Sequence, residues 1–192
     1  MSLGFSFTYF GNNFQTVTVD TNGYALFSSQ TTCCSLALPA ISNSISGLNY
    51  DLKTTSSVGT SGIFYRSLTQ ALNANELASI KSSINRLVSS FVPTNGFQLV
   101  WNNVSSLSGG LTATFSIDLA SDSSSSYVVL KYSSCLNGAT LISTPGLYYN
   151  ITNGVLQILP ITNPCSSSNV NLPGTWVFVV SSIGKLAIMY QK

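Results

Sequence analysis

Side chains that commonly do chemistry are scarce in this chain. It has no histidine, which is the usual partner of a serine or cysteine nucleophile and a frequent metal ligand. Five carboxylates are present, at Asp20, Asp51, Glu76, Asp118 and Asp122. No two of them stand out as the acid and base of a glycoside hydrolase, and no glycine-rich phosphate loop is found. The sequence therefore predicts a protein that is not an enzyme, with no cofactor and no metal site.

The four cysteines are Cys33, Cys34, Cys135 and Cys165. In an extracellular protein an even number of cysteines predicts disulfides, here two of them. A bridge between the adjacent Cys33 and Cys34 would be strained, so we expect each to pair with Cys135 or Cys165, in an order that the sequence leaves open. A four-cysteine zinc site is the alternative, but adjacent cysteines fit poorly with a spacing of about two to four residues between ligands.

Two further motifs concern modification and metal binding. Asn103-Val104-Ser105 and Asn150-Ile151-Thr152 are acceptor triplets for N-linked glycans. Asp20-Thr21-Asn22-Gly23 resembles the start of a calcium-binding loop, but the later ligands and the bidentate glutamate are missing, so a plain turn is favoured.

The small share of charged residues in the chain restricts the partners that it can bind and the compartment in which it is expected. Charged residues make up 6% of its 192 residues and the net charge is +2, whereas an ordinary soluble domain has about 25%. Such a chain offers no basic surface for nucleic acid. A surface so poor in charge needs either glycans to solvate it or neighbouring copies to cover it. We therefore expect a secreted or cell-surface glycoprotein that forms a homo-oligomer or homopolymer.

A membrane-spanning segment is not expected. A spanning helix needs about 20 consecutive apolar residues. The best candidate, Trp176–Tyr190, is interrupted by Ser181, Ser182, Gly184 and Lys185.

The elements that must position these residues are mostly strands. Apolar alternation and β-branched runs predict strands at residues 3–10, 62–68, 96–104, 111–119, 127–132, 155–161, 175–181 and 186–190. Residues 11–28 predict a β-hairpin, whose turn is Asp20-Thr21-Asn22-Gly23 because Asn-Gly tolerates positive φ. One helix is predicted over residues 74–91, from Leu77, Ile80, Ile84, Leu87, Val88 and Phe91 at helical spacing. Asn73 and Glu76 stand where a capping box would begin this helix. The fold class is α+β, mostly β: antiparallel, sandwich-like sheets with one helix packed on a sheet.

The order of these landmarks resembles the nidogen-type extracellular domain, called NIDO, of nidogens, tectorins and membrane mucins. Residues 3–11 (LGFSFTYFG) and 17–27 are similar to the opening of that family, and residues 62–68 (GIFYRSL) to its YYR strand. Residues 100–104, 113–119 and 127–132 are similar to its central strands. Residues 168–178 (SNVNLPGTWVF) resemble its S-N-V…P-G-x-W-x-F finish, so the resemblance spans residues 3–180. An acidic, tryptophan-containing stretch of the family is replaced here by apolar, serine-rich residues 38–50, with Asp51 as its remnant.

The resemblance implies a structural or adhesive extracellular module without catalytic activity. It divides the chain into a NIDO-like domain, residues 1–181, and an extension, residues 182–192. Leu186, Ile188 and Tyr190 alternate in this extension and are candidate contacts for docking onto a neighbouring copy. Our first hypothesis is a subunit of an extracellular filament, matrix or surface coat. The alternative is an adhesion module of a larger protein that recognises a protein or a glycan.

Overall fold

The computed structural model describes residues 1–27, 43–54, 61–122, 124–136, 145–150 and 156–182. It confirms the mostly β fold with antiparallel sheets and one short helix. Its largest sheet has the strand order β13 (Thr175–Val179), β10 (Ser126–Ser134), β9 (Thr112–Ser121) and β8 (Asn95–Ser106). Two strands pair with the free side of β8: β7 (Gly62–Thr69) pairs with residues 95–102, and β6 (Leu52–Lys53) pairs with residues 105–106.

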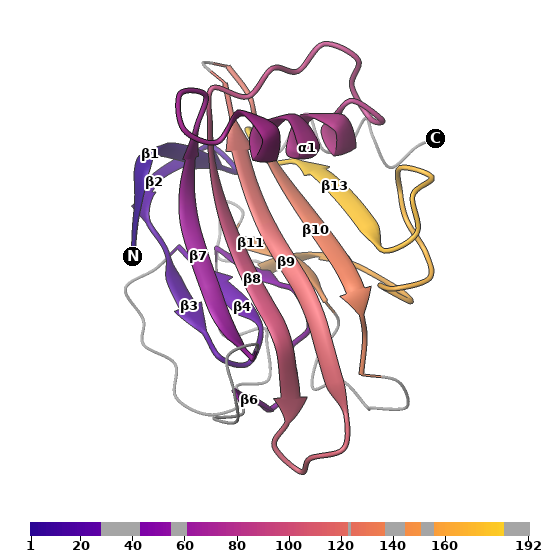
Figure 1. The fold of residues 1–192 in the computed structure, drawn as a ribbon. Coiled ribbons are helices and arrows are strands. Elements are labelled where there is room, and N and C mark those ends of the chain that lie inside the picture. Colours follow the sequence, from indigo (N-terminus) through magenta and orange to yellow (C-terminus); the bar gives the residue numbers. More distant parts are fainter. Residues whose placement is uncertain (28–42, 55–60, 123, 137–144, 151–155, 183–192) are drawn as a thin grey trace.

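A second sheet and a separate hairpin lie behind this large sheet (Figure 1). The second sheet has the order β12 (Leu156–Pro160), β11 (Gly146–Asn150), β5 (Ser44–Ser46), β4 (Tyr24–Leu26) and β3 (Thr18–Asp20). The hairpin consists of β1 (Ser2–Tyr9) and β2 (Asn12–Thr16). The sequence pattern missed β5 and β11, since neither shows an alternation long enough to be recognised.

The main core lies between the large sheet and these two smaller sheets. Each central strand sends alternate side chains into it, with Phe97, Leu99 and Trp101 from β8 and Phe115, Ile117 and Leu119 from β9. The rings of Trp101 and Phe115 stack with centroids 4.9 Å apart. This alternation is the physical reason why the strand positions were predictable from the sequence.

Tyr9 ties the hairpin to the second sheet. Its hydroxyl donates to the backbone carbonyls of Ser44 at 2.8 Å and Tyr148 at 3.2 Å. Burial raises the pKa of this hydroxyl well above its ordinary value, so it remains a donor over the whole physiological pH range. The second sheet is thus fixed to the hairpin by a polar contact within the core.

The predicted hairpin at residues 11–28 needs correction. Residues 12–16 form β2, which pairs with β1, and only residues 18–20 pair with residues 24–26. The chain changes sheet at Val17, whose backbone exchanges hydrogen bonds with Met1. Within the turn only Gly23 has a positive φ, of 95°, and the Asp20 carboxylate accepts a bond from the Asn22 backbone. A turn therefore joins β3 and β4 at these residues, as the sequence predicted.

The helix α1 spans Ala74–Ile84 and not residues 74–91. It packs on the outer face of the large sheet through Leu77, Ile80 and Ile84. After Ile84 the chain turns, yet Leu87 and Val88 still pack against the same cluster, which is why the apolar spacing continues beyond the helix. Asn73 makes no capping bond, and Glu76 bonds Arg66 in place of the helix N-terminus, so the predicted capping box is wrong.

Candidate functional site

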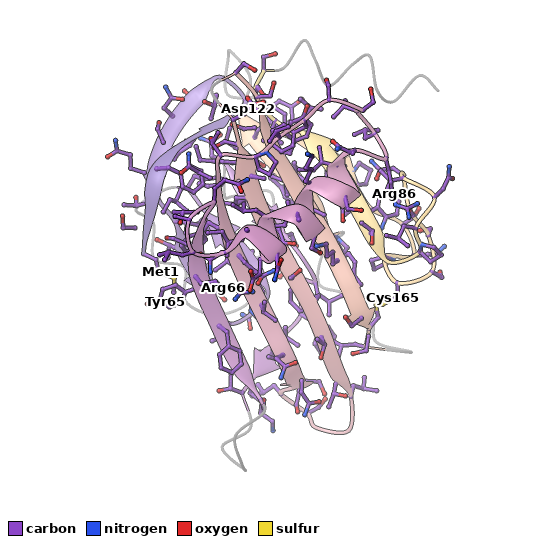
Figure 2. The ribbon with its side chains drawn as sticks, turned by 45° about the horizontal axis from the view of Figure 1, so that its top comes forward. Met1, Tyr65, Arg66, Arg86, Asp122 and Cys165 are labelled. Carbon is purple, nitrogen blue, oxygen red and sulfur yellow. A yellow bond between two sulfur atoms is a disulfide. The ribbon has the colours of Figure 1, made fainter. Side chains whose placement is uncertain are left out.

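The outer face of the large sheet carries a row of polar side chains that bond one another. The helix α1 covers one half of this face, and Arg66 lies beside the helix, on β7 (Figure 2). A polar row begins where the helix cover ends and crosses β7, β8, β9 and β10. Its members are Glu76, Arg66, Gln98, Asp118 and Lys131.

Each member of this polar row is bound to the next. Arg66 donates to Glu76 at 2.9 Å and, through Nε and Nη2, to Gln98 at 3.2 and 2.9 Å. Gln98 donates to Asp118 Oδ1 at 3.0 Å, and Asp118 Oδ2 lies 3.0 Å from the Lys131 ammonium. The Asp118 side chain is fully buried, so this row supports the sheet and does not present a carboxylate to a substrate.

The other carboxylates are placed in turns and loops. Asp20 and Asp122 accept bonds from backbone N–H groups two or three residues ahead of them. Asp51 is half-buried, and its backbone carbonyl accepts a bond from Leu107. Among the residues that the structure describes, no three metal-binding side chains come close enough to hold an ion.

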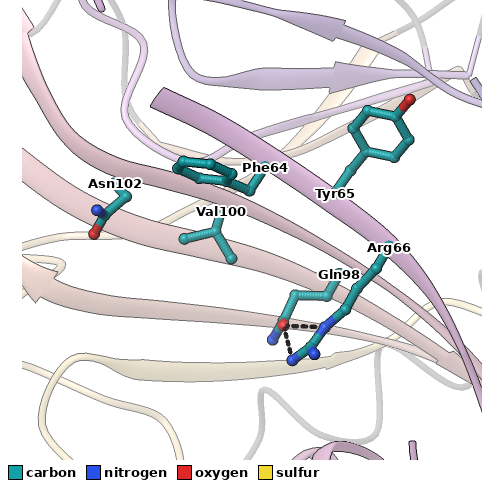
Figure 3. Close-up of a pocket in the computed structure, with 6 residues that line it drawn as sticks. All are labelled: Phe64, Tyr65, Arg66, Gln98, Val100 and Asn102. Carbon is teal, nitrogen blue, oxygen red and sulfur yellow. Dashed lines mark hydrogen bonds between the residues drawn. The ribbon is translucent and has the colours of Figure 1, made fainter. Parts of the chain in front are cut away.

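A shallow groove of about 350 Å³ lies on the open half of the outer face (Figure 3). It is lined by Phe64, Tyr65, Arg66, Gln98, Val100 and Asn102. Because Arg66 and Gln98 already bond one another, the groove has few polar groups left to recognise a ligand. Its main exposed feature is the ring of Phe64, since 51% of this residue is exposed, whereas the Tyr65 ring lies on the other face of β7, against Phe97.

Strand β7 forms one edge of the large sheet. Residues 64–67 are exposed along this edge, where the Ser67 hydroxyl donates to the Leu3 carbonyl of β1 at 2.9 Å, and the only strand that pairs with β7 in the described part of the chain is β8. Backbone groups at a sheet edge can pair with a strand of another chain.

The opposite edge, β13, is closed by side chains. Asn169 accepts from the Val177 backbone at 2.9 Å and donates to the Val177 carbonyl at 2.7 Å, as a neighbouring strand would. Ser168 donates to the Thr175 carbonyl at 2.7 Å. These contacts give a physical role to the Ser168-Asn169 pair, which the sequence showed only as part of a family resemblance. The two edges of the sheet are therefore unequal.

Replacing Asn169 with alanine should destabilise the protein and open the β13 edge. Loss of both bonds leaves the Val177 N–H and C=O unpaired, at an expected cost of about 1–2 kcal/mol in the free energy of unfolding. Urea denaturation measures this cost, with Asn12→Ala, at an exposed position of β2, as the matched control. Equal stability of the two variants would show that Asn169 does not close the edge.

One disulfide joins Cys135, which follows β10, to Cys165, which precedes β13, with Cα atoms 6.1 Å apart. The expectation that each of them pairs with Cys33 or Cys34 is therefore wrong. The reason is tertiary: β10 and β13 are neighbours in the sheet, and the Tyr132 N–H donates to the Gly174 carbonyl, which brings the two flanking segments together. Cys33 and Cys34 lie outside the described residues.

The two glycosylation triplets differ in what the structure reveals of them. Asn103 lies on β8 at an irregularity in the pairing with β9, and its side chain is exposed. Asn150 ends β11, and its side chain lies outside the described residues. The candidate docking residues Leu186, Ile188 and Tyr190 also lie outside them. Within the described residues, no helix is long and apolar enough to cross a membrane.

Comparison with known proteins points to one family. The family model described as a nidogen-like domain matches residues 15–182, which is most of the chain. No curated protein and no solved structure matches the chain.

Proposed function

The chain belongs to the nidogen-like domain family, and on this premise we propose that it is a non-enzymatic structural subunit of an extracellular glycoprotein assembly, built by association of copies of the chain. The family is extracellular and non-catalytic, and a disulfide fits a secreted protein. The proposal adds self-association in a filament, matrix or surface coat to that family role.

The observation that carries the proposal is that side chains close one edge strand of the large sheet, β13, and leave the other, β7, exposed. Asn169 and Ser168 close the β13 edge, whereas residues 64–67 of β7 are exposed. Proteins that remain monomeric usually protect long edge strands with charges, prolines or covering loops. The exposed part of β7 carries two half-exposed aromatic rings and one charged residue, Arg66, which supports its use as a contact surface.

The complementary strand in this proposal is the extension, residues 182–192, of a neighbouring copy. Leu186, Ile188 and Tyr190 alternate, so they would share one face of an added strand. Strand addition gains affinity from main-chain bonds and specificity from alternate side chains. Because the extension and the β7 edge are different surfaces, such contacts are heterologous, and they build open chains of copies when the rotation between copies does not close a ring.

The polar row supports a structural role over a catalytic one. Asp118, the most deeply buried of the carboxylates, is occupied by Gln98 and Lys131. A general acid or base needs a carboxyl group that can reach a substrate. The bonds of Asp118 to Gln98 and Lys131 support a role in stabilising the sheet.

A second candidate function is adhesion within a larger protein. The groove at Phe64 and Val100 favours it, since an exposed aromatic ring suits the apolar face of a sugar or of a protein loop. Here the protein would remain monomeric and lose its partner when Phe64 is replaced.

Deletion of residues 184–192 tests the first proposal. We expect the full chain to form regular filaments or lattices in electron micrographs of the glycosylated material, and the truncated chain to sediment as a monomer with an unchanged melting temperature. A lower melting temperature with assembly intact would instead make the extension a strand of its own domain and overturn the docking proposal.

A matched pair of variants separates the two faces of the extension. Ile188→Asp should abolish association, because it places a charge in the apolar row, whereas Met189→Asp should retain most of it. Truncated chains keep the β7 edge, so adding them to full chains should shorten the polymers in proportion to the ratio of the two. An equal loss of association in both variants would contradict docking by a strand.

A further inference from the structure

The main-chain irregularity at Asn103 presents this residue on the outer face. Trp101 and Val104 both lie in the main core although they are three residues apart, which breaks the alternation of a regular strand. The pairing with β9 shifts between these two residues, as in a β-bulge. Asn102 and Asn103 are therefore the two residues that the strand turns away from the core.

The backbone at Asn103 suits asparagine and is held in place. Its φ is 48°, in the left-handed region that asparagine accepts more readily than other non-glycine residues. Its N–H donates to Thr114 Oγ1 at 3.0 Å, and Thr114 belongs to the adjacent strand. The side-chain amide of Asn103 is thus exposed on a fixed backbone.

An aromatic ring lies exposed near this position. Phe64 is opposite Val100, and its ring lies over Gly62, where a Cβ atom would be only 3.1 Å from Phe64 Cζ. Gly62 in turn is opposite Asn102, the residue before Asn103. The ring is therefore directed along β7 toward the bulge, and Phe64 and Asn102 line the same groove (Figure 3).

We propose that Asn103 carries an N-linked glycan whose first N-acetylglucosamine packs on the ring of Phe64 and fills the groove. The Nδ2 atom of Asn103 bonds to C1 of the sugar and loses a proton, while the bond from C1 to the diphosphate of a lipid-linked oligosaccharide breaks and the lipid diphosphate leaves with the electron pair. The apolar face of the sugar then removes part of the ring from water. The proposal rests on the extracellular location of the family and not on self-association.

The acceptor triplet also indicates when the sugar is added. Ser105, the hydroxyl residue of the triplet, is 8% exposed and lies between Lys53 and Thr112 in the sheet. An enzyme that must reach both Asn103 and Ser105 finds them accessible only before the sheet closes. The glycan is therefore expected on the secreted protein, and folded unglycosylated protein is expected to be a poor acceptor.

The test compares the glycosylated and deglycosylated forms of three proteins, all secreted by the same cells and all carrying Asn150→Gln. They are the parent, Phe64→Ala, and the control Tyr65→Ala, which removes an equally exposed ring from the other face of β7. Peptide mapping establishes occupancy of Asn103, and the glycan is trimmed to one sugar or removed enzymatically. Melting temperatures are measured at low protein concentration, so assembly does not enter.

Complete removal of the glycan should lower the melting temperature of the parent and of Tyr65→Ala by about 2–4 °C, and that of Phe64→Ala by less than about 1 °C. Trimming to a single sugar should leave the parent unchanged, because only the first sugar meets the ring. A fourth protein, Gly62→Ala, keeps the ring but displaces it, and it should behave as Phe64→Ala. An unoccupied Asn103, or an equal shift in all three proteins, would overturn the proposal whether or not the protein assembles.

Discussion

Gly174→Ala is expected to lower the free energy of unfolding by about 2–4 kcal/mol and the melting temperature by about 6–12 °C. Gly174 has a φ of 75°, and an added Cβ would lie 2.6 Å from the backbone carbonyl oxygen of Tyr132. Backbone atoms cannot move aside as a flexible side chain can. The substitution must therefore shift the chain where β10, β13 and the loop before β13 meet.

The position of Gly174 makes this shift costly. Its carbonyl accepts from the Tyr132 N–H at 2.8 Å, and its N–H donates to the Ser167 carbonyl at 3.1 Å. Displacing Gly174 thus disturbs Ser167, which precedes the two residues that close the β13 edge. We expect Gly174→Ala to increase association through β13 as well as to destabilise the fold.

Gly110→Ala is the matched control. Gly110 has a φ of 84°, close to that of Gly174, but nothing lies within 4 Å of the position of its Cβ. Its substitution should cost about 1 kcal/mol, which is the cost of the left-handed backbone alone. Urea denaturation measures both variants. Similar losses in the two would show that the contact with the Tyr132 carbonyl has no energetic weight.

Asp118→Ala is expected to cost about 3 kcal/mol, the second large effect. The substitution removes a fully buried carboxylate and leaves the Gln98 amide and the Lys131 ammonium without their partner. Lys131 is 27% exposed and can turn partly toward water. The expected loss in the free energy of unfolding is therefore at the lower end of the range for breaking a buried ion pair. The melting temperature should fall by about 6–12 °C.

Glu76→Ala is the control at the exposed end of the polar row. The pair of Arg66 and Glu76 is 46% and 34% exposed, so its loss should cost no more than about 1 kcal/mol. Replacing both members of the buried pair, in Asp118→Leu with Lys131→Met, should restore most of the stability, because no unpaired charge remains. If Asp118→Ala lowered the free energy of unfolding as little as Glu76→Ala, the polar row would not support the sheet.

The local pattern of the sequence was sufficient for most of the large sheet. Strands β8, β9, β10 and β13 were predicted to within a few residues, because each sends alternate apolar side chains into the core, and β7 was predicted from its β-branched and aromatic run, although residues 64–67 are exposed. The helix was predicted from Leu77, Ile80 and Ile84 for the same kind of reason. Its predicted end was wrong because Leu87 and Val88 pack on the same cluster from a turn, and apolar spacing alone does not distinguish a turn from a helix.

The surfaces that matter for function were less predictable. Glu76 suggested a helix cap by its distance from Asn73, but its partner is Arg66 on a neighbouring strand. No sequence pattern indicated that Asp118 and Lys131 would face one another, since their pairing depends on the register of β9 and β10. Phe64 was part of a recognised strand, and only the structure shows that its ring is directed toward Asn103 through the space left by Gly62.

The sequence by itself determined the class of fold, the strands with a strict period of two, the turn at Gly23 and the family resemblance. These are decided by neighbours along the chain, through side-chain alternation and the backbone freedom of single residues. Only the tertiary structure decided that Cys135 bonds Cys165, that Asn169 closes one edge of the sheet and that β7 exposes the other. Each of these results depends on which distant segments the register of the sheet brings together, and register is a property of the packed core.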